Sequence, residues 1–179
     1  TCLLLGLSCS KNKFLDINDN PNNPTVVPPK VLLPTTTIGI AFTNGNELGR
    51  VASLLVQHNA GVANQAGNFD IYNLDGSFDN AWDFEIYANC VSDLRSLIAS
   101  TEATSPVYAG IAKIQLAYIF SIATDLWGDV PCSEGGFGLK FISPRFDLQQ
   151  DIYQGDAAKG ITSLFDLVKS GLADLDKTG

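Results

Sequence analysis

Apolar residues recur every three or four positions in four long segments of the chain, a spacing typical of helices with one buried face. The segments span about residues 47–66, 78–99, 107–126 and 148–175. No segment alternates apolar and polar residues to a comparable degree. The pattern therefore predicts an all-α fold, with helices joined by modest loops and arranged in antiparallel pairs.

Three of these segments carry a clear apolar stripe. The first places Leu48, Val51, Ala52, Leu55, Asn59 and Val62 on one face. The second repeats at nearly every fourth position, with Phe78, Trp82, Ile86, Cys90, Leu94 and Leu97. The last has the cleanest stripe, formed by Ile161, Leu164, Phe165, Val168, Leu172 and Leu175. Upstream of them, residues 30–41 are apolar and rich in threonine, which is compatible with either a helix or a strand.

The segment 107–126 is apolar nearly all round, which indicates either a central buried helix or a membrane span. Pro106 is well placed to begin this helix, and Gly128 and Pro131 follow its end. Lys113 lies inside it, and a central lysine costs about 2.5–3.5 kcal/mol on membrane-insertion scales. This cost favours a buried helix of a folded domain.

Composition limits the class of protein further. The chain has 179 residues, of which 45% are hydrophobic, so it can build the core of one domain. Its formal net charge is −8, and it contains no long basic run. Nucleic-acid binding is excluded on this ground, because phosphate contacts require clustered lysine and arginine.

The N-terminus carries a possible anchor. A short apolar run ends in Ser8 before Cys9, and the sequence then becomes abruptly polar. This pattern is typical of the end of a bacterial lipoprotein signal peptide, with Cys9 as the lipidated residue. The alternative is a buried N-terminal strand with a core cysteine. We expect residues 1–8 to end a truncated signal peptide, residues 9–30 to form a lipid-anchored tether, and residues 31–179 to form the N-terminal portion of a helical domain from a longer protein.

The sequence gives little support for a catalytic site or a metal site. His58 is the only histidine, and no nucleophile motif accompanies it. Cys90 and Cys132 lack the paired spacing of a zinc site and are predicted to be free thiols. The Asp- and Asn-rich segment 16–29 resembles a calcium loop only at its start, because Pro21 and Val27 occupy positions that need Gly and Glu. We expect no metal and no cofactor.

Two polar regions remain as candidates for binding or catalysis. Asp125, Asp129 and Glu134 surround Trp127 and are compatible either with the acid and base of a glycosidase or with caps of a structural corner. The segment 65–82 mixes aromatic residues with Asn and Asp, a combination that suits sugar rings and hydroxyls. Its alternative is a solvated connection whose aromatic residues are tucked into the core.

Several short motifs, taken in their order along the chain, resemble those of a known protein family. After Cys9 these are Phe14-Leu15-Asp16-Ile17-Asn18, Asn20-Pro21-Asn22, Leu32-Leu33-Pro34, Gln57, Trp82 with Tyr87, Asp93-Leu94, Tyr108-Ala109-Gly110-Ile111-Ala112-Lys113-Ile114, Thr124-Asp125-Leu126-Trp127-Gly128-Asp129-Val130-Pro131, Pro144-Arg145-Phe146-Asp147, Gln149 and Ile152-Tyr153. Together they resemble the SusD/RagB family of nutrient-binding outer-membrane lipoproteins. Cys132 departs from the family pattern, in which an aromatic residue follows the proline.

The resemblance implies tetratricopeptide-like helix pairs and a surface lipoprotein that is not an enzyme. Such a protein captures an oligosaccharide or a peptide for a TonB-dependent β-barrel transporter of the SusC type in the outer membrane. The resemblance also implies that the loop between the first two clear helices approaches the ligand. On that basis we expect Phe69, Tyr72 and Asn73 to bind it. Two other classes stay open: a secreted glycan-active enzyme, and a helical-repeat adaptor without a small ligand.

Overall fold

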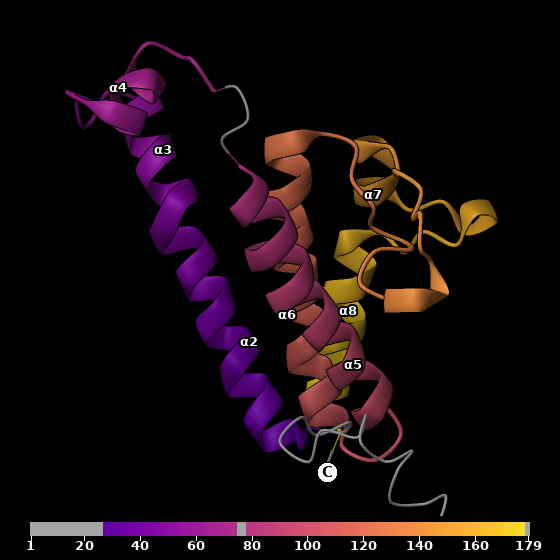
Figure 1. The fold of residues 1–179 in the computed structure, drawn as a ribbon. Helices are drawn as coiled ribbons and strands as arrows, with labels where there is room; N and C mark the ends of the chain where they lie inside the picture. Colours follow the sequence, from indigo (N-terminus) through magenta and orange to yellow (C-terminus); the bar gives the residue numbers. More distant parts are fainter. Residues whose placement is uncertain (1–26, 75–77, 178–179) are drawn as a thin grey trace, which may run out of the picture.

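The computed structural model describes residues 27–74 and 78–177, and within these two ranges every regular element is a helix (Figure 1). The elements are α2 (Pro29–Thr43), η2 (Asn44–Leu48), α3 (Gly49–Leu55), α4 (Asn64–Asp70), η3 (Asn80–Val91), α5 (Ser92–Thr101), α6 (Pro106–Trp127), η4 (Gly138–Lys140), α7 (Gln149–Gln154), η5 (Ala157–Lys159) and α8 (Leu164–Leu175). The predicted all-α class is confirmed. The predicted signal-peptide end, Cys9 and most of the tether lie outside the described residues.

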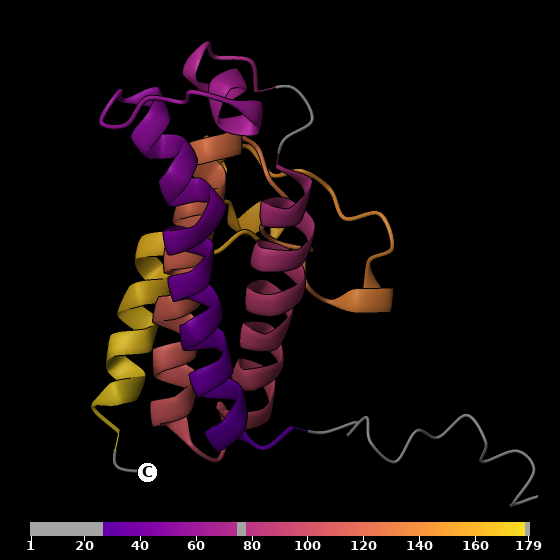
Figure 2. The same ribbon diagram turned by 60° about the vertical axis from the view of Figure 1, so that its left-hand side comes forward.

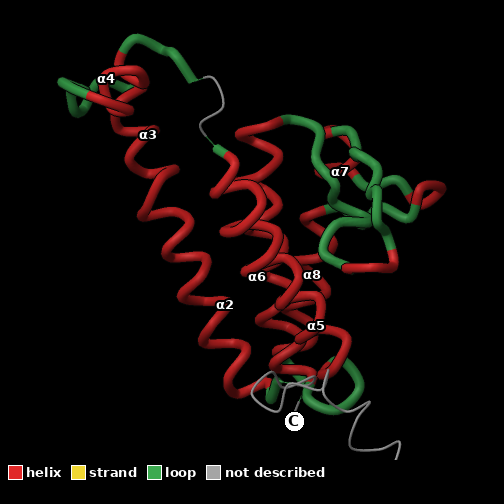
Figure 3. Tube along the Cα trace, viewed as in Figure 1, coloured by secondary structure: helices red, strands yellow, loops and turns green. Residues whose placement is uncertain are grey.

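Four long helical stretches run alternately up and down the molecule (Figures 1 and 2). The stretch from α2 to α3 rises, η3 and α5 descend, α6 rises again, and α8 descends. Their loops gather mostly at the end where α6 finishes (Figure 3). The stretch 30–41, which the sequence left open, is helical. The tetratricopeptide-like character of the pairing stays a prediction.

Helix α6 is the central helix. It packs against α8, α5 and α2, and its fully buried residues include Ala109, Ala112, Ile119, Phe120 and Ala123. By length and composition alone it could cross a membrane, but 56% of its most apolar window is buried within the protein. Pro106 begins the helix and Gly128 follows its last residue, as predicted. Its apolar character is therefore explained by its place among the other helices.

The last predicted helix, 148–175, is wrong as a single element. It is divided into α7, η5 and α8, because Gly155 and Gly160 adopt positive φ angles of 82° and 70° that a continuing helix does not allow. The prediction of which residues of this segment form its buried face is also partly wrong. Phe165 and Leu172 are 63% and 52% exposed, whereas Gly171 is buried.

Close approach of two backbones explains which face of α8 is buried. A Cβ atom on Gly171 would lie 2.8 Å from the carbonyl oxygen of Gly110, and one on Gly110 would lie 2.6 Å from that of Gly171. Only glycine at both positions lets α6 and α8 come this near. Asp174, on the same face of α8, pairs with the buried Lys113 of α6. Small and paired polar residues, and not the largest apolar ones, therefore set the contact.

The first predicted helix, 47–66, is wrong at both ends. Helical structure begins at Pro29 and ends at Leu55, so Asn59 and Val62 lie in a loop and Val62 is 92% exposed. Within the long helical stretch Asn46 has non-helical angles (φ −90°, ψ −115°), which marks a kink. Its side-chain nitrogen donates a 2.8 Å hydrogen bond to buried Glu85, which holds the kink against η3.

Two separate cores result. The large one joins α2, η3, α5, α6 and α8, and it includes the predicted stripe residues Ile86, Cys90, Leu94 and Leu97. The small one consists of Val51, Leu54 and Phe69, with Leu55, Ala66, Leu74 and Phe78 around them. The α3–α4 region is thus packed largely on itself at one end of the bundle, next to the end of α6.

Candidate ligand-binding site

The segment 56–73, which follows α3 and contains the short helix α4, holds three non-glycine residues with positive φ angles, and we call it the strained loop. Gln57, Asn64 and Tyr72 have φ angles of 58°, 51° and 61°, and they are the only non-glycine residues with positive φ in the part of the chain that the structure describes. Asparagine tolerates this region, but glutamine and tyrosine rarely enter it. Such residues cluster at ligand-binding and active sites, where the surrounding structure holds them in place.

The structure brings Tyr72 and Asn73 to the surface of this loop, as expected for ligand-binding residues. Tyr72 is 61% exposed, and its hydroxyl donates a 3.2 Å hydrogen bond to the carbonyl oxygen of Leu55. Asn73 is exposed beside it. The hydrogen bond orients the tyrosine ring across the end of α3. Their binding of a ligand stays a prediction.

Phe69 has a different role from the one expected. The predicted polar segment 65–82 begins inside helix α4, and Phe69 lies on the buried side of this helix. Its side chain is fully buried and stacks on Phe78, with ring centroids 6.0 Å apart. The ring therefore belongs to the small core and offers no open face to a ligand. The alternative interpretation, an aromatic residue tucked into the core, holds for this residue.

A row of aromatic rings connects this loop with a segment far along the chain. Trp127, at the end of α6, lies 6.2 Å from Phe78 and 5.3 Å from Trp82, measured between ring centroids. Trp82 in turn stacks on Phe146 at 6.2 Å with an angle of 11° between the rings. Phe146 is 63% exposed and was missed by the sequence analysis, although it belongs to the Pro-Arg-Phe-Asp motif.

A pocket of about 340 Å³ opens between α3 and the end of α6. Its walls are formed by Leu48, Val51, Ala52, Leu55, Val56, Leu74, Phe78, Leu126 and Trp127. Leu55 is one of these lining residues, and its backbone carbonyl accepts the hydrogen bond from the Tyr72 hydroxyl, so Tyr72 contacts a residue of the pocket wall. The strained loop, the row of aromatic rings and the pocket therefore occupy one end of the bundle.

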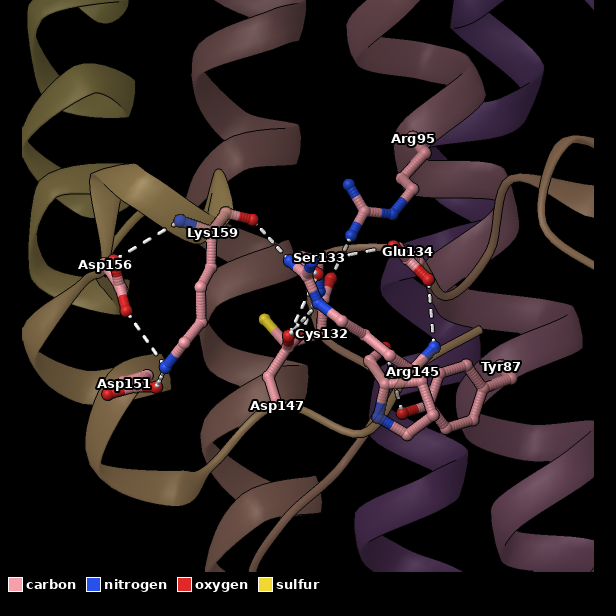
Figure 4. A network of polar contacts seen from close by, with 11 residues as sticks. Tyr87, Arg95, Cys132, Ser133, Glu134, Arg145, Asp147, Asp151, Asp156 and Lys159 are labelled. Carbon is pink, nitrogen blue, oxygen red and sulfur yellow. Dashed lines mark hydrogen bonds and ion pairs between the residues drawn. The ribbon is translucent and has the colours of Figure 1, made fainter. Parts of the chain in front are cut away.

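The loops after α6 are fixed by a polar network around Asp147 (Figure 4). The buried Asp147 carboxylate accepts hydrogen bonds from the backbone nitrogen and the hydroxyl of Ser133, and from Arg145 Nε at 2.9 Å. Val130 and Asp147 also exchange backbone hydrogen bonds. The network therefore ties residues 130–133 to 145–147. It holds the segment that carries Phe146 next to the bundle.

Arg95 of α5 fixes the same loops from the other side (Figure 4). Its guanidinium group donates hydrogen bonds to the carbonyl oxygens of Gly135 and Cys132. It also lies over the Phe137 ring, 4.2 Å from the centroid. Arginine suits this position because its planar group can donate in several directions while it stacks on an aromatic face.

The three acidic residues near Trp127 act as caps and loop ties. Asp125 accepts from the Tyr153 hydroxyl at 2.8 Å, and Asp129 accepts from the backbone nitrogen of Gln149, the first residue of α7. Glu134 accepts from the backbone nitrogen of Arg145 at 2.9 Å. Each carboxylate has a structural partner, which matches the corner interpretation.

The other groups with possible reactivity are two cysteines and His58. Cys90 and Cys132 are free, as predicted, and both are buried, which raises the pKa of their thiols to about 11 and about 12. Both are therefore protonated near neutral pH and poor nucleophiles. His58 is exposed in the loop after α3. Within residues 27–74 and 78–177, no three His, Cys, Asp or Glu side chains are grouped so that they could hold a metal ion.

Comparison with known proteins gives one match. A family model of the SusD-like group, described as "Starch-binding associating with outer membrane", matches residues 21–159. No curated protein and no solved structure matches the chain. The matched range includes the strained loop, the row of aromatic rings and the polar network. It covers most of the 179 residues, and the chain therefore belongs to this SusD-like family of starch-binding proteins associated with the outer membrane.

Proposed function

We propose that this protein is a surface lipoprotein that captures an oligosaccharide or a peptide and delivers it to a TonB-dependent, SusC-like transporter. The family match supports a binding role at the outer membrane. The observation that carries the proposal is the exposed Tyr72 just after α4, which has a positive φ angle and is held by its hydrogen bond to the Leu55 carbonyl. A binding loop on a rigid helical scaffold is a common arrangement for ligand recognition.

The residues at this end favour binding over catalysis. Tyr72 offers an aromatic face and Asn73 offers both donor and acceptor groups, which suits hydroxyls or peptide groups of a ligand. The carboxylate of Asp70, two residues before Tyr72, accepts a hydrogen bond from the backbone nitrogen of Gly61, and Asp129 accepts one from the backbone nitrogen of Gln149. A glycan-active enzyme needs two available carboxylates on either side of the scissile bond. A binding protein needs none.

Tyr72 provides the direct test of the site. We expect Tyr72→Ala to weaken ligand binding about tenfold, or about 1.4 kcal/mol, because the exposed ring loses its contact with the ligand. Helical content and melting temperature should stay nearly unchanged, since the side chain is 61% exposed. Isothermal titration calorimetry with a panel of maltooligosaccharides and short peptides measures the effect.

Tyr118 gives the matched control for this measurement. It is an exposed tyrosine on α6, 49% accessible, and its hydroxyl lies near Asn44 and not near the strained loop. Tyr118→Ala should bind ligand as the wild type does. Equal ligand affinities of the Tyr72→Ala and Tyr118→Ala proteins would show that the loop is a solvated connection and does not bind the ligand.

Anchoring depends on Cys9, which lies outside the described residues. We expect Cys9→Ala to abolish incorporation of radiolabelled palmitate and to release the protein from the membrane fraction, because anchoring by acyl chains requires their attachment site. Cys2→Ala is the matched control, since Cys2 lies within the predicted signal peptide. Labelling that persists in the Cys9→Ala protein would contradict the lipoprotein assignment.

A further inference from the structure

The pocket between α3 and the end of α6 differs from a sugar site in its chemistry. Its nine lining residues are seven aliphatic residues, Phe78 and Trp127. The indole N–H of Trp127 is the only polar side-chain group among them. An oligosaccharide ring inside the pocket would leave most of its hydroxyls without partners, which is unfavourable in an apolar environment. A hydrocarbon group faces no such cost.

The size of the pocket suits a ligand group and not only a packing gap. An engineered apolar cavity of about 150 Å³ stays dry and binds benzene. The pocket here has about 340 Å³, in the lower part of the range for small-molecule sites. Val56 and Leu126, two of its lining residues, are 62% and 56% exposed, so the pocket is open to solvent at its edge.

The pocket lies where two separately packed units meet. One wall comes from α3, whose Val51 belongs to the small core, and the opposite wall comes from Trp127, which packs against the large core. Phe78 of the small core meets the Trp127 ring edge-on, with 6.2 Å between ring centroids, and the space beside this contact is left open as the pocket. The Tyr72 hydroxyl donates a hydrogen bond to the backbone carbonyl of Leu55, a residue that lines the pocket, so the polar phenol group contacts the pocket wall.

We propose that this pocket binds an uncharged hydrocarbon group, aliphatic or aromatic, that the captured ligand carries beside its polar part. This proposal rests on the proposed function and adds a requirement on the ligand, which must carry an apolar group as well as a polar part. Tyr72 and Asn73 contact the polar part, and the pocket takes the apolar part. Two kinds of ligand meet this requirement: a peptide with a large apolar side chain, and a glycoside with a hydrocarbon substituent.

Binding of the uncharged fluorescent dye N-phenyl-1-naphthylamine tests the pocket. The wild type should bind it saturably, with increased fluorescence. Ala52→Phe should weaken dye binding at least tenfold, because Ala52 lines the pocket and a phenyl ring there fills it. Ala41→Phe is the matched control, since Ala41 is an exposed alanine on α2 that does not line the pocket. Val56→Trp, at the exposed pocket edge, provides a second filling variant should Ala52→Phe lower the melting temperature.

Competition separates the sources of the hydrocarbon group. A leucine- or phenylalanine-containing tripeptide and octyl glucoside, below its micelle concentration, are added to the dye complex. Displacement by either one, together with no displacement by free glucose, supports the proposal and identifies the source. Displacement by glucose, or equal dye binding by the Ala52→Phe, Val56→Trp and Ala41→Phe proteins, overturns it.

The same titrations keep this proposal distinct from the proposed function. If the wild type binds an oligosaccharide or peptide through Tyr72 but does not bind the dye, the apolar pocket is overturned and the binding function stands. If the dye binds in the pocket while no oligosaccharide or peptide binds, the capture function is wrong, and the pocket is an apolar site unconnected with it, which also overturns the proposal as stated.

Discussion

Lys113→Ala is expected to lower the free energy of unfolding by about 3 kcal/mol, since it leaves a buried carboxylate without its main partner. Lys113 Nζ lies 2.7 Å from Asp174 Oδ2 and 2.6 Å from Glu102 Oε1. The side chains of Lys113 and Asp174 are 9% and 6% exposed. Lys177 remains beside Asp174 in the variant and compensates in part. Urea denaturation measures the loss.

Two further variants isolate the buried pair. Lys113→Met with Asp174→Leu should recover most of the stability, because apolar residues of similar volume replace a buried ion pair at little cost. Lys169→Ala is the exposed control, as Lys169 and Asp166 are 75% and 60% exposed and their pair contributes little. A Lys113→Ala protein as stable as the Lys169→Ala protein would contradict the structural role of the pair.

The ion pair between Lys113 and Asp174 also makes the stability of the protein depend on pH. Hydrogen bonds from Lys113 and Lys177 hold the pKa of Asp174 below its usual value of 3.8. The carboxylate therefore stabilises the fold above that value, and this contribution is lost as the pH falls through the lowered pKa. Wild-type stability should fall more steeply below about pH 4 than that of the Lys113→Ala protein.

Trp127→Ala is expected to lower the free energy of unfolding by about 3 kcal/mol, the lower end of the range for truncation of a large buried aromatic residue. Trp127 packs against Phe78 and Trp82, but it is only half-buried because one side faces the pocket. It also lies at a corner that Gly128 completes, with a φ angle of 77°. Calorimetric or denaturant unfolding measures the change.

Phe146→Ala is the control for this prediction. Phe146 also contacts Trp82, yet it is 63% exposed and its removal opens no buried space. Its variant should stay within about 0.5 kcal/mol of the wild type. A Trp127→Ala protein with unchanged melting and lost ligand binding would move Trp127 from the scaffold to the ligand site.

Local signals in the sequence were sufficient for the two helices that form the centre of the bundle. The four-residue repeat from Phe78 to Leu97 matches η3 and α5, and Pro106 and Gly128 mark the bounds of α6. These signals depend on residues close in sequence. The periodicity of apolar residues, helix-starting proline and helix-ending glycine all act over one or two turns.

Contacts between distant segments account for the errors. The buried face of α8 is set by Gly171 against Gly110 and by Asp174 against Lys113, so apolar periodicity alone selects the wrong neighbours. The kink at Asn46 depends on Glu85 in another helix. Neither interaction leaves a repeating pattern in the sequence, and only the folded chain brings the partners together.

The candidate site was predicted in part. The sequence placed an aromatic, polar loop between the first two clear helices, and Tyr72 and Asn73 are exposed there. It did not predict that α4 would turn Phe69 inward, nor that Phe146 would join the row of aromatic rings. The apolar pocket was also missed, because its lining residues come from separate parts of the chain: several lie within 48–56, two are Leu74 and Phe78, and two are Leu126 and Trp127.

The most direct test of the central claim is a mass balance during ligand binding. The protein is incubated with each maltooligosaccharide and peptide that titration calorimetry shows to bind, and the ligand is then recovered and analysed by mass spectrometry. If the protein captures nutrients for a transporter, ligand binding is saturable and Tyr72→Ala weakens it. The ligand is then recovered intact. Shortened oligosaccharides or peptides in the wild-type sample, absent from a protein-free control, would contradict the account.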